Sequence, residues 1–491
     1  MVRRVALVFA VVLGVVLAGS PAGASPGGSP GSAGIGDPYF PLDGNGGYDV
    51  RHYGLNIKYT PETDVLAGVA TIRSRATQNL SAFNLDFVGL TIRDLTVDGR
   101  PAQWTRNGGE LTVTPRRTLR KGQAFVTKVT YDGIPQVIVD PNLGDAGVFH
   151  TDDGVVIIGQ PDVAATWFPA NDHPLDKASF TISVTVPKGL EAVSNGALTG
   201  KSTKRGWTTW NWDAPEPMAT YLATATVGEY DLKAYRADGI KFWDALDPKL
   251  PKATYDFAAG SFARQPEILR FLADRFGPYP FKTSGGIVDN NNDFGFALEN
   301  QTRPIYAPGF FRSAERGDGV VVHELAHQWY GDSLALARWQ DIWLNEAFAS
   351  YAEWMWSEDQ GLGTAQEIFD AYYNEYPADS DFWILPIGDP GPDHLFDGEV
   401  YDRGAMTMHA LRLAVGDRTF LKILRTWAQS RSGDNVTTPE FIAHAERISG
   451  QQLDALFTAW LFTPSKPAAP AAQARLLSTP QVKVSPQHVR R

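Results

Sequence analysis

The feature that most constrains this chain of 491 residues is the run His323-Glu324-Leu325-Ala326-His327. On an α-helix, positions i and i+4 lie about 40° apart on one face, so two imidazoles on neighbouring turns can bind one metal ion. Glu324 follows the first histidine and could reach a metal-bound water without ligating the metal itself. The alternative is an ordinary helix face that carries two histidines.

A third potential ligand strengthens the metal interpretation. Glu346 comes nineteen residues after His327, at the start of a second helical pattern. Two antiparallel helices would bring it beside the imidazoles. Two histidines and one glutamate make three protein ligands, and a catalytic zinc site keeps its fourth position open for water. Taken alone, Glu346 would be a first-turn acid that complements the helix dipole.

The composition limits the chemistry that such a chain can carry. There is no cysteine, which excludes disulfides, cysteine nucleophiles and thiolate zinc sites, so any metal must be held by His, Asp or Glu. The net charge is −11, from 44 basic and 55 acidic residues, which argues against a nucleic-acid surface as the main function. Apolar residues make up 43% of the chain, enough for a sizeable core.

The amino terminus is typical of a secretory signal. Arg3 and Arg4 precede an apolar run over residues 5–18, and small residues follow at 22–24. The run is shorter than the roughly 20 residues that span a bilayer, so a signal peptide over 1–24 is favoured over an anchor. Residues 25–44 are rich in Gly, Ser and Pro and predict a flexible linker. We expect a secreted, extracellular monomer without a membrane span after cleavage, exported by the Sec or the twin-arginine route.

The rest of the chain divides by hydrophobic pattern. Residues 45–235 alternate apolar and polar positions between turn signals, for example over 180–186, which predicts an all-β saddle or sandwich domain. Residues 236–463 show helical spacing, with a break expected near Pro266. Helices are predicted over 257–276, 320–330, 345–356, 404–413 and 439–448. Residues 464–491 are rich in Pro and Ala and predict a disordered tail.

Several motifs resemble one family. The decapeptide HELAHQWYGD at 323–332, followed by WLNE at 343–346, is similar to the zinc signature of the aminopeptidase N family of gluzincin metallopeptidases, which includes the leukotriene epoxide hydrolase. The resemblance covers roughly residues 45–463. Four further segments are similar to family motifs: GFALEN at 295–300, YDRGA at 401–405, FPANDHP at 168–174, and MATYL at 218–222 followed by Gly228.

The resemblance implies a thermolysin-like α/β, mainly helical, zinc peptidase domain behind the β domain. It further implies an aminopeptidase that removes N-terminal residues from peptides with a free amino terminus, using one zinc ion. The implied roles are zinc binding by His323, His327 and Glu346, general base for Glu324, oxyanion donor for Tyr401, α-ammonium acceptor for Glu299, and substrate contact for Gln160, Asp162, Ala297 and Asn300.

The chain also departs from the family pattern. Phe296 and Leu298 replace a Gly and a Met of the exopeptidase motif, and the Phe296 ring could reshape the pocket for the first side chain. Asp162 is one methylene shorter than the family glutamate, which puts its reach in doubt. Ala347 for Gly and Arg403 for Lys are expected to be mild exchanges. The large helical C-terminal domain of longer members is missing, so a more open cleft is expected.

Other functions stay open at this stage. A thermolysin-type endopeptidase would share the zinc site but need no amine anchor. A noncatalytic secreted protein that binds peptides on a peptidase scaffold would usually have lost Glu324 or a ligand, and the motifs do not exclude epoxide hydrolysis as a second activity. Asp341 is a further candidate, as a group that could orient a ligand imidazole.

Overall fold

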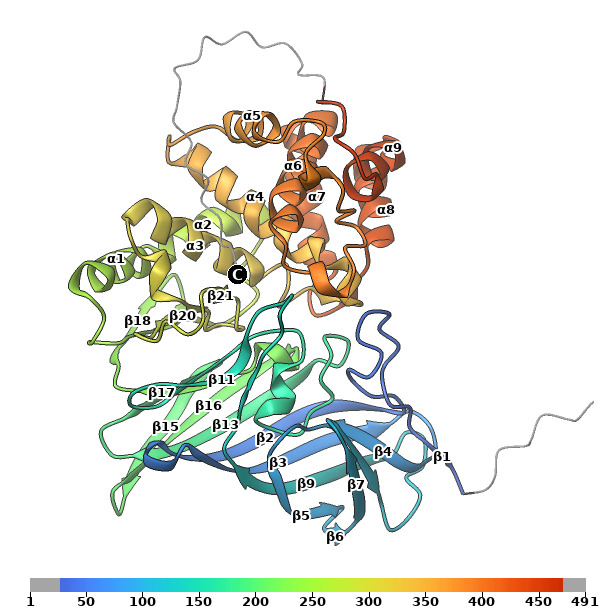
Figure 1. The fold of residues 1–491 in the computed structure, drawn as a ribbon, viewed down its shortest axis with the longest axis vertical. Helices are drawn as coiled ribbons and strands as arrows, with labels where there is room; N and C mark the ends of the chain where they lie inside the picture. The colour runs from blue at the N-terminus through green and yellow to red at the C-terminus, as the bar shows by residue number, and fades with distance from the viewer. Residues whose placement is uncertain (1–26, 471–491) are drawn as a thin grey trace, which may run out of the picture.

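The computed structural model describes residues 27–470, which fold as an all-β part followed by a mainly helical part (Figure 1). This order confirms the fold class predicted from the sequence. The expected signal peptide, residues 1–24, and most of the expected tail, residues 471–491, lie outside the described residues. Within 27–470, no helix combines the length and the apolar character that crossing a bilayer requires.

An eight-stranded sheet is the base of the β part. All neighbouring strands pair antiparallel except β13 and β2, which are parallel. The apolar residues of the alternating run at 180, 182, 184 and 186 are at most 1% exposed, as their period of two predicts. In sheet order the strands are β15 (Ala197–Lys204), β16 (Trp207–Met218), β13 (Ala178–Pro187), β2 (Tyr48–Thr60), β3 (Val65–Ala76), β9 (Ala124–Gly133), β5 (Thr91–Val97) and β6 (Arg100–Pro101).

Two smaller sheets pack on this base. Tyr48 of the base and Phe83 of the first small sheet meet edge to face, with ring centroids 5.5 Å apart. Trp212 of the base donates from Nε1 to the carbonyl of Ala192 in the second, at 3.0 Å. The first contains β1 (Ser29–Pro30), β4 (Leu80–Asp86), β8 (Glu110–Thr114) and β7 (Gln103–Asn107); the second contains β10 (Val137–Ile138), β11 (Ala146–His150), β12 (Val155–Ile158), β17 (Ala225–Gly228) and β14 (Glu191–Ser194).

The second part begins with its own five-stranded sheet. The boundary expected after residue 235 falls inside β18, which pairs with β19 along its whole length. The strands in sheet order are β18 (Asp231–Ala237), β19 (Ile240–Leu246), β20 (Thr283–Val288), β22 (Ile305–Tyr306) and β21 (Ala297–Leu298). The short strands β23 (Ala335–Leu336) and β24 (Asn435–Val436) pair with each other. The strand β21 matters most for function, because it leads into Glu299.

Helices make up most of the second part. They are α1 (Lys252–Ala263), α2 (Gln265–Phe276), α3 (Ala314–His327), α4 (Trp343–Asp359), α5 (Ala365–Glu375), α6 (Gly398–Val415), α7 (Asp417–Ser430), α8 (Thr438–Ser449) and α9 (Asp454–Phe457). The predicted break is confirmed: α1 ends before Arg264, and Pro266 lies in the first turn of α2, where no N–H is needed. An ideal Cβ on Gly404 would lie 2.8 Å from the Cβ of Ala347, so α6 and α4 pack closely at this point.

Two segments expected to be flexible are packed instead. The described part of the predicted linker adds β1 beside β4 and buries Asp37, which is 3% exposed. At the other end, Lys466 Nζ donates to the carbonyls of Tyr373 at 2.6 Å and Tyr376 at 2.8 Å, so residues 464–470 dock against α5. The composition of both segments predicts flexibility. In the structure, one polar side chain in each segment, Asp37 or Lys466, forms several hydrogen bonds.

Candidate active site

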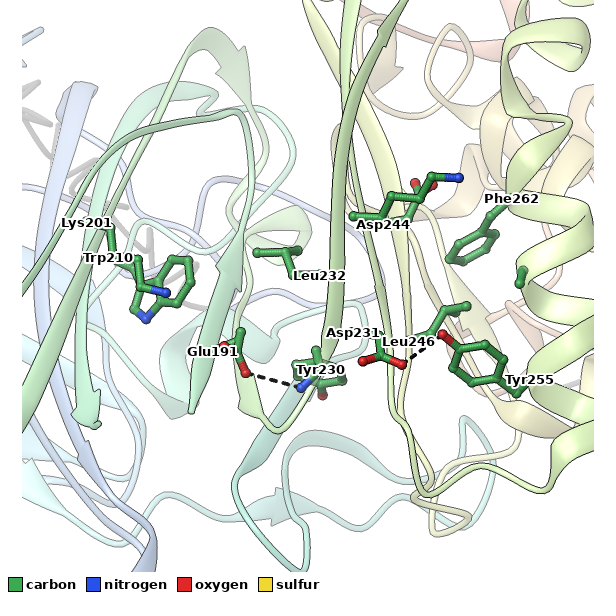
Figure 2. Close-up of a pocket in the computed structure, with 12 residues that line it drawn as sticks. Glu191, Lys201, Trp210, Tyr230, Asp231, Leu232, Asp244, Leu246, Tyr255 and Phe262 are labelled. Atoms are coloured by element: carbon green, nitrogen blue, oxygen red, sulfur yellow. Dashed lines mark hydrogen bonds between the residues drawn. The ribbon is translucent and has the colours of Figure 1, made fainter. Parts of the chain in front are cut away.

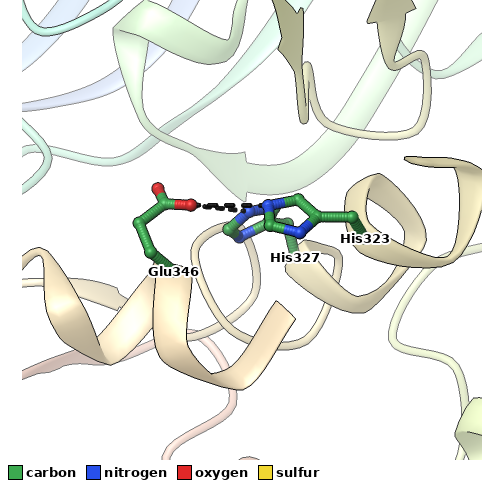
Figure 3. Close-up of side chains that lie close together, drawn as sticks. All are labelled: His323, His327 and Glu346. Carbon is green, nitrogen blue, oxygen red and sulfur yellow. Dashed lines mark ion pairs between the residues drawn. The ribbon is translucent and has the colours of Figure 1, made fainter. Parts of the chain in front are cut away.

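Three predicted metal ligands converge between α3 and α4. Glu346 points toward both imidazoles, and its Oε2 lies 3.4 Å from Nε2 of His323 and 3.4 Å from Nε2 of His327 (Figure 3). All three residues are at most 2% exposed. The histidines lie in the last two turns of α3, and Glu346 lies in the first turn of α4. The helix pair therefore presents two nitrogens and one carboxylate oxygen to a single point.

The spacing of these donor atoms fits zinc. Zinc binds imidazole nitrogen and carboxylate oxygen at about 2.0–2.2 Å, so two ligand atoms of a tetrahedral site lie about 3.4 Å apart. The two nitrogen–oxygen separations equal this value, and the three donor atoms all lie within 4.8 Å of one another. With three protein ligands, the site leaves one tetrahedral position for water or substrate.

Both imidazoles are held by their other ring nitrogen. His323 Nδ1 lies 2.8 Å from Oε1 of Glu353, and His327 Nδ1 lies 3.0 Å from the carbonyl of Tyr330. Each acceptor fixes the proton on Nδ1, so each Nε2 presents its lone pair to the metal position. Glu353 was not predicted from the sequence. The available signal was its spacing, because Glu353 is seven residues, or about two turns, after Glu346 on the same helix.

Asp341, a further candidate for orienting a ligand imidazole, bonds elsewhere. Its Oδ1 accepts from the backbone N of Thr438 at 3.1 Å and from the hydroxyl of the same residue at 2.6 Å. Its Oδ2 pairs with Arg338 at 3.1 Å. The carboxylate is thus used to tie the start of α8 to the turn before α4, and Glu353 takes the role of orienting His323.

Burial and charge set the protonation of the two acids beside the metal position. Burial raises the pKa of Glu346, but the imidazoles of His327 and His323 outweigh it and bring that pKa to about 2. Glu324 has no such direct partner, and burial raises its pKa to about 8 although the same imidazoles oppose the shift. The surroundings therefore favour the anionic form of Glu346, which suits a cation, whereas burial favours the protonated form of Glu324.

A small hollow opens onto the metal position. Tyr401, on the first turns of α6, is half-buried there, and its ring stacks on that of His323 with centroids 6.1 Å apart. The lining consists of eight residues, all predicted from the sequence as site residues: Gln160, Ala297, Glu299, His323, Glu324, His327, Glu346 and Tyr401.

Glu299 is 2% exposed and is held from two sides. The hydroxyl of Tyr221, from the 3₁₀ turn Thr220–Leu222, donates to Oε1 of Glu299 at 2.9 Å. Nε2 of Gln328 donates to its backbone carbonyl at 3.0 Å. Tyr221 belongs to the segment MATYL, which resembles a family motif but gave no role for the tyrosine. Its contact with Glu299 could not be read from the sequence, because 78 residues separate the two.

Two of the predicted substrate-binding residues lie outside the hollow's lining. Asn300 donates from Nδ2 to the carbonyl of Leu222 at 3.0 Å, so it fixes the loop after β21 to the β part. Asp162 follows Gln160 but lies in a group of carboxyls: burial and Asp140 raise its pKa, and Asp162 in turn raises the pKa of Asp43. The doubt about its reach is consistent with this placement.

A wider hollow lies elsewhere, between the β part and α1 (Figure 2). Tyr255 donates there to Oδ2 of Asp231 at 2.9 Å, and the backbone N of Tyr230 donates to Glu191 at 3.3 Å. Its lining contains lysines, acids and aromatic rings but no histidine. It therefore lacks the donor set that makes the smaller hollow the candidate active site.

Comparison with known families gives two adjacent matches. Residues 50–222 match the Peptidase M1 N-terminal domain, and residues 261–460 match the Peptidase family M1 domain. The first match lies in the β part, and the second includes α3, α4 and α6.

Known proteins extend these matches over most of the chain. Glutamyl aminopeptidase of Sus scrofa is 23% identical over 89% of this chain and 49% of its own length, and aminopeptidase N of Bos taurus is 27% identical over 70% of this chain and 38% of its own length. The chain thus spans about half of the length of the first of these curated relatives, and less than half of the second. The crystal structure of an M1 zinc metallopeptidase from Deinococcus radiodurans superposes with a TM-score of 0.82 at 29% identity, over 90% of this chain and 100% of that one. A mutant of that protein bound to a Tyr-Ser-Ala substrate superposes with a TM-score of 0.80 at 28% identity, over 89% of this chain and 99% of that one.

Proposed function

Because this chain belongs to peptidase family M1, as its matches over 50–222 and 261–460 show, we propose that it is a zinc-dependent aminopeptidase. One observation carries the proposal. A single hollow brings together a metal-binding triad, a free carboxyl at Glu324, a phenol at Tyr401 and a second buried carboxylate at Glu299. Each of these groups has a role in removing an N-terminal residue.

Glu299 gives the site its preference for a chain start. Its side chain lies in the hollow beside Glu324, within 4.8 Å of the nearest donor atoms of Glu324 and His327. An α-ammonium bound there forms a charge-assisted hydrogen bond, which is stronger than a neutral one. A peptide held by its first amine can place only its first peptide bond beside the metal ligands. This constraint makes the proposed enzyme an exopeptidase.

Glu324 and Tyr401 divide the proton transfers. A zinc ion held by His323, His327 and Glu346 supplies Lewis acidity, which polarises a carbonyl and makes water a stronger acid. Glu324 accepts the proton of the attacking water and delivers it to the leaving amine. The Tyr401 phenol donates to the oxyanion that develops on the carbonyl.

The base assignment is tested by Glu324→Gln. Loss of general acid–base catalysis is expected to lower kcat on aminoacyl amides by roughly 10³-fold. The zinc content is expected to stay at one ion per chain, because Glu324 is not a ligand. Metal analysis by mass spectrometry and steady-state kinetics of the same sample check both. A variant that keeps its activity would refute the role of Glu324.

The amine anchor is tested by Glu299→Ala with paired substrates. A lost hydrogen bond to a charged group is worth about 1.5–3 kcal/mol, so kcat/KM on a free-amine substrate is expected to fall roughly 10- to 100-fold. The low activity on the matching N-acetylated peptide is expected to change little. Equal losses on both substrates would contradict amine anchoring. Efficient internal cleavage of acetylated peptides by the unchanged protein would identify an endopeptidase instead.

We further propose that the protein is exported and acts outside the cell as a monomer. The support is the sequence of residues 1–24, with its two arginines, apolar run and small residues. Edman or mass-spectrometric sequencing of protein recovered from culture medium is expected to find a first residue close to Ser25. Protein that keeps Met1 and stays with the cells would contradict export.

A further inference from the structure

A short segment of the expected linker lies between the two parts of the molecule. Residues 35–45, here called the interdomain strap, follow β1 and precede β2. In Figure 1 this blue segment rises from the sheet toward the orange helices. Its β end is fixed by Asn171, whose Nδ2 donates to the carbonyl of Asn45 at 3.3 Å. Further contacts reach the turns that precede α4 and α6.

Asp37 is the centre of the strap. Oδ1 accepts from the backbone N of Tyr39 at 2.8 Å and of Phe40 at 3.1 Å, which shapes the strap itself. Oδ2 accepts from the backbone N of Trp339 at 2.9 Å and lies 3.1 Å from Nε2 of His173. One buried carboxylate thus joins the strap, the β part at His173 and the helical part at Trp339.

The proton on His173 has one possible position. Its Nδ1 accepts from the backbone N of Leu175 at 3.1 Å, so the ring hydrogen must be on Nε2 and must point at Asp37. All four groups around the carboxylate are therefore donors. An amide at position 37 would offer one oxygen and would turn its NH₂ toward two of these donors.

Trp339 connects Asp37 to the amine pocket. It begins the 3₁₀ turn Trp339–Asp341 before α4 and is 1% exposed. Its ring lies between Phe40 of the strap, at 6.4 Å between centroids, and Tyr221, at 5.5 Å. Tyr221 is the residue whose hydroxyl holds Oε1 of Glu299. The carboxylate that would grip the substrate is therefore two side chains away from the strap.

A second contact fixes the strap to the helical part. The hydroxyl of Tyr39 donates to Asp389 and accepts from the backbone N of Gly391 at 2.8 Å. Both partners belong to the loop before α6, which carries Tyr401. Removing this hydroxyl would loosen the strap without opening a cavity in the core.

We propose that the interdomain strap, through Asp37, positions Glu299 for the substrate's α-ammonium; this inference rests on the proposed aminopeptidase function. Asp37 is a positioning residue, since it acts on the pocket through Trp339 and Tyr221. Loss of its bonds lets Trp339 and Tyr221 shift, and the grip on the amine weakens. Metal binding and the proton transfers of Glu324 do not depend on this path.

The test measures peptide binding in a Glu324→Gln background, so that no substrate is consumed. Isothermal titration calorimetry compares an uncapped tripeptide with its N-acetylated form, at equal zinc content. Asp37→Asn is expected to weaken binding of the uncapped peptide about tenfold, the loss typical of an unpaired buried donor. Binding of the acetylated peptide is expected to stay within about twofold. Asp98→Asn is the matched control, because Asp98 also accepts a backbone N–H, from Val126, but in a turn of the β part.

Tyr39→Phe keeps the test decisive if Asp37→Asn does not fold. This variant removes one hydroxyl. It is expected to weaken binding of the uncapped peptide about threefold, the effect of losing one modest hydrogen bond, and to leave binding of the acetylated peptide unchanged. A preference for the uncapped peptide that survives both variants unchanged would overturn the strap inference alone. Unchanged protein that binds both peptides equally would overturn the amine grip, and with it the proposed function.

Discussion

At the scale of single residues, Glu353 shows how much of a metal site lies outside its ligands. It is half-buried beside His323 on α4 and accepts from Nδ1 at 2.8 Å. A carboxylate in this position fixes the ring orientation and makes the ligating nitrogen a better donor. The site therefore depends on two carboxylates of α4, Glu346 and Glu353, placed two turns apart.

Removal of this support is expected to weaken zinc binding in a graded way. Glu353→Ala is expected to lower zinc affinity about 10- to 100-fold, the usual effect of losing a carboxylate that orients a ligand. Glu353→Gln is expected to fall between Ala and the unchanged chain, because an amide oxygen still accepts from Nδ1 but carries no charge. Competition with a chelating dye measures the affinities. Glu358→Ala, on the same helix but paired with Arg412, is the control and is expected to bind zinc normally.

The residues at the site that the sequence could predict are those with a short-range pattern. His323, Glu324 and His327 are defined by helical spacing, and Glu346 by its position in the next helix. The contact of Tyr221 with Glu299 and the contacts of Asp37 join distant segments, and spacing along the chain carries no information about them. The partner of Asp341 could not be predicted for the same reason, since Thr438 is 97 residues away.

At the scale of elements, α6 is fixed to the end of the chain by one guanidinium. Arg403 is fully buried and donates to five backbone carbonyls. These belong to Trp383, Leu385, Ala459, Trp460 and Thr463, at 2.7–3.3 Å. Arg403 lies two residues after Tyr401, and its guanidinium binds the carbonyls at the end of the helical part. The replacement of the family lysine by Arg403, expected from the sequence to be mild, gives this chain five donors where a lysine would offer three.

Arg403→Lys is expected to destabilise the helical part. An ammonium has three donors where the guanidinium has five, so at least two buried carbonyls lose their partner, at about 1–3 kcal/mol each. We expect the free energy of unfolding to fall by about 3 kcal/mol, measured by urea denaturation. Arg270→Lys, an exposed exchange at an ion pair with Asp238, serves as control and is expected to cost under about 0.5 kcal/mol. Equal stability of the two variants would contradict this role of Arg403.

Some boundaries of helices and strands are set by local residues that can be recognised in the sequence. Others are set by tertiary contacts that the sequence does not show. Pro266 predicts the break between α1 and α2, which the structure confirms. Helix α3 begins at Ala314, six residues before the predicted start, because Ser313 caps it by accepting from the backbone N of Arg316. The strap could not be predicted, since residues 25–44 have the Gly, Ser and Pro content typical of linkers and the partners that order the strap lie far away in the sequence.

At the scale of the whole molecule, carboxyls are buried inside the β part and around the strap. Burial raises the pKa of Asp86 to about 7, helped by Glu110 and opposed by the backbone N of Asp172. Burial and Asp49 raise the pKa of Asp176 to about 8. Asp86 also accepts from Nδ2 of Asn45 at 3.1 Å, which joins it to the end of the strap. The folded chain therefore holds protons near neutral pH that the unfolded chain has released.

This difference sets how stability depends on pH. A carboxyl whose folded pKa lies above its unfolded value of about 3.9 binds more protons in the folded state, so its contribution to stability falls as pH rises through the folded pKa. For Asp86 alone, the free energy of unfolding is expected to be about 2 kcal/mol larger at pH 5.5 than at pH 8.5. Asp86→Asn is expected to reduce this slope, whatever it does to absolute stability, and Asp98→Asn, in an exposed turn, is expected to leave it unchanged. Urea unfolding at three pH values and fixed zinc measures the slopes, and an Asp86→Asn slope equal to that of the unchanged chain would show that Asp86 is ionised throughout.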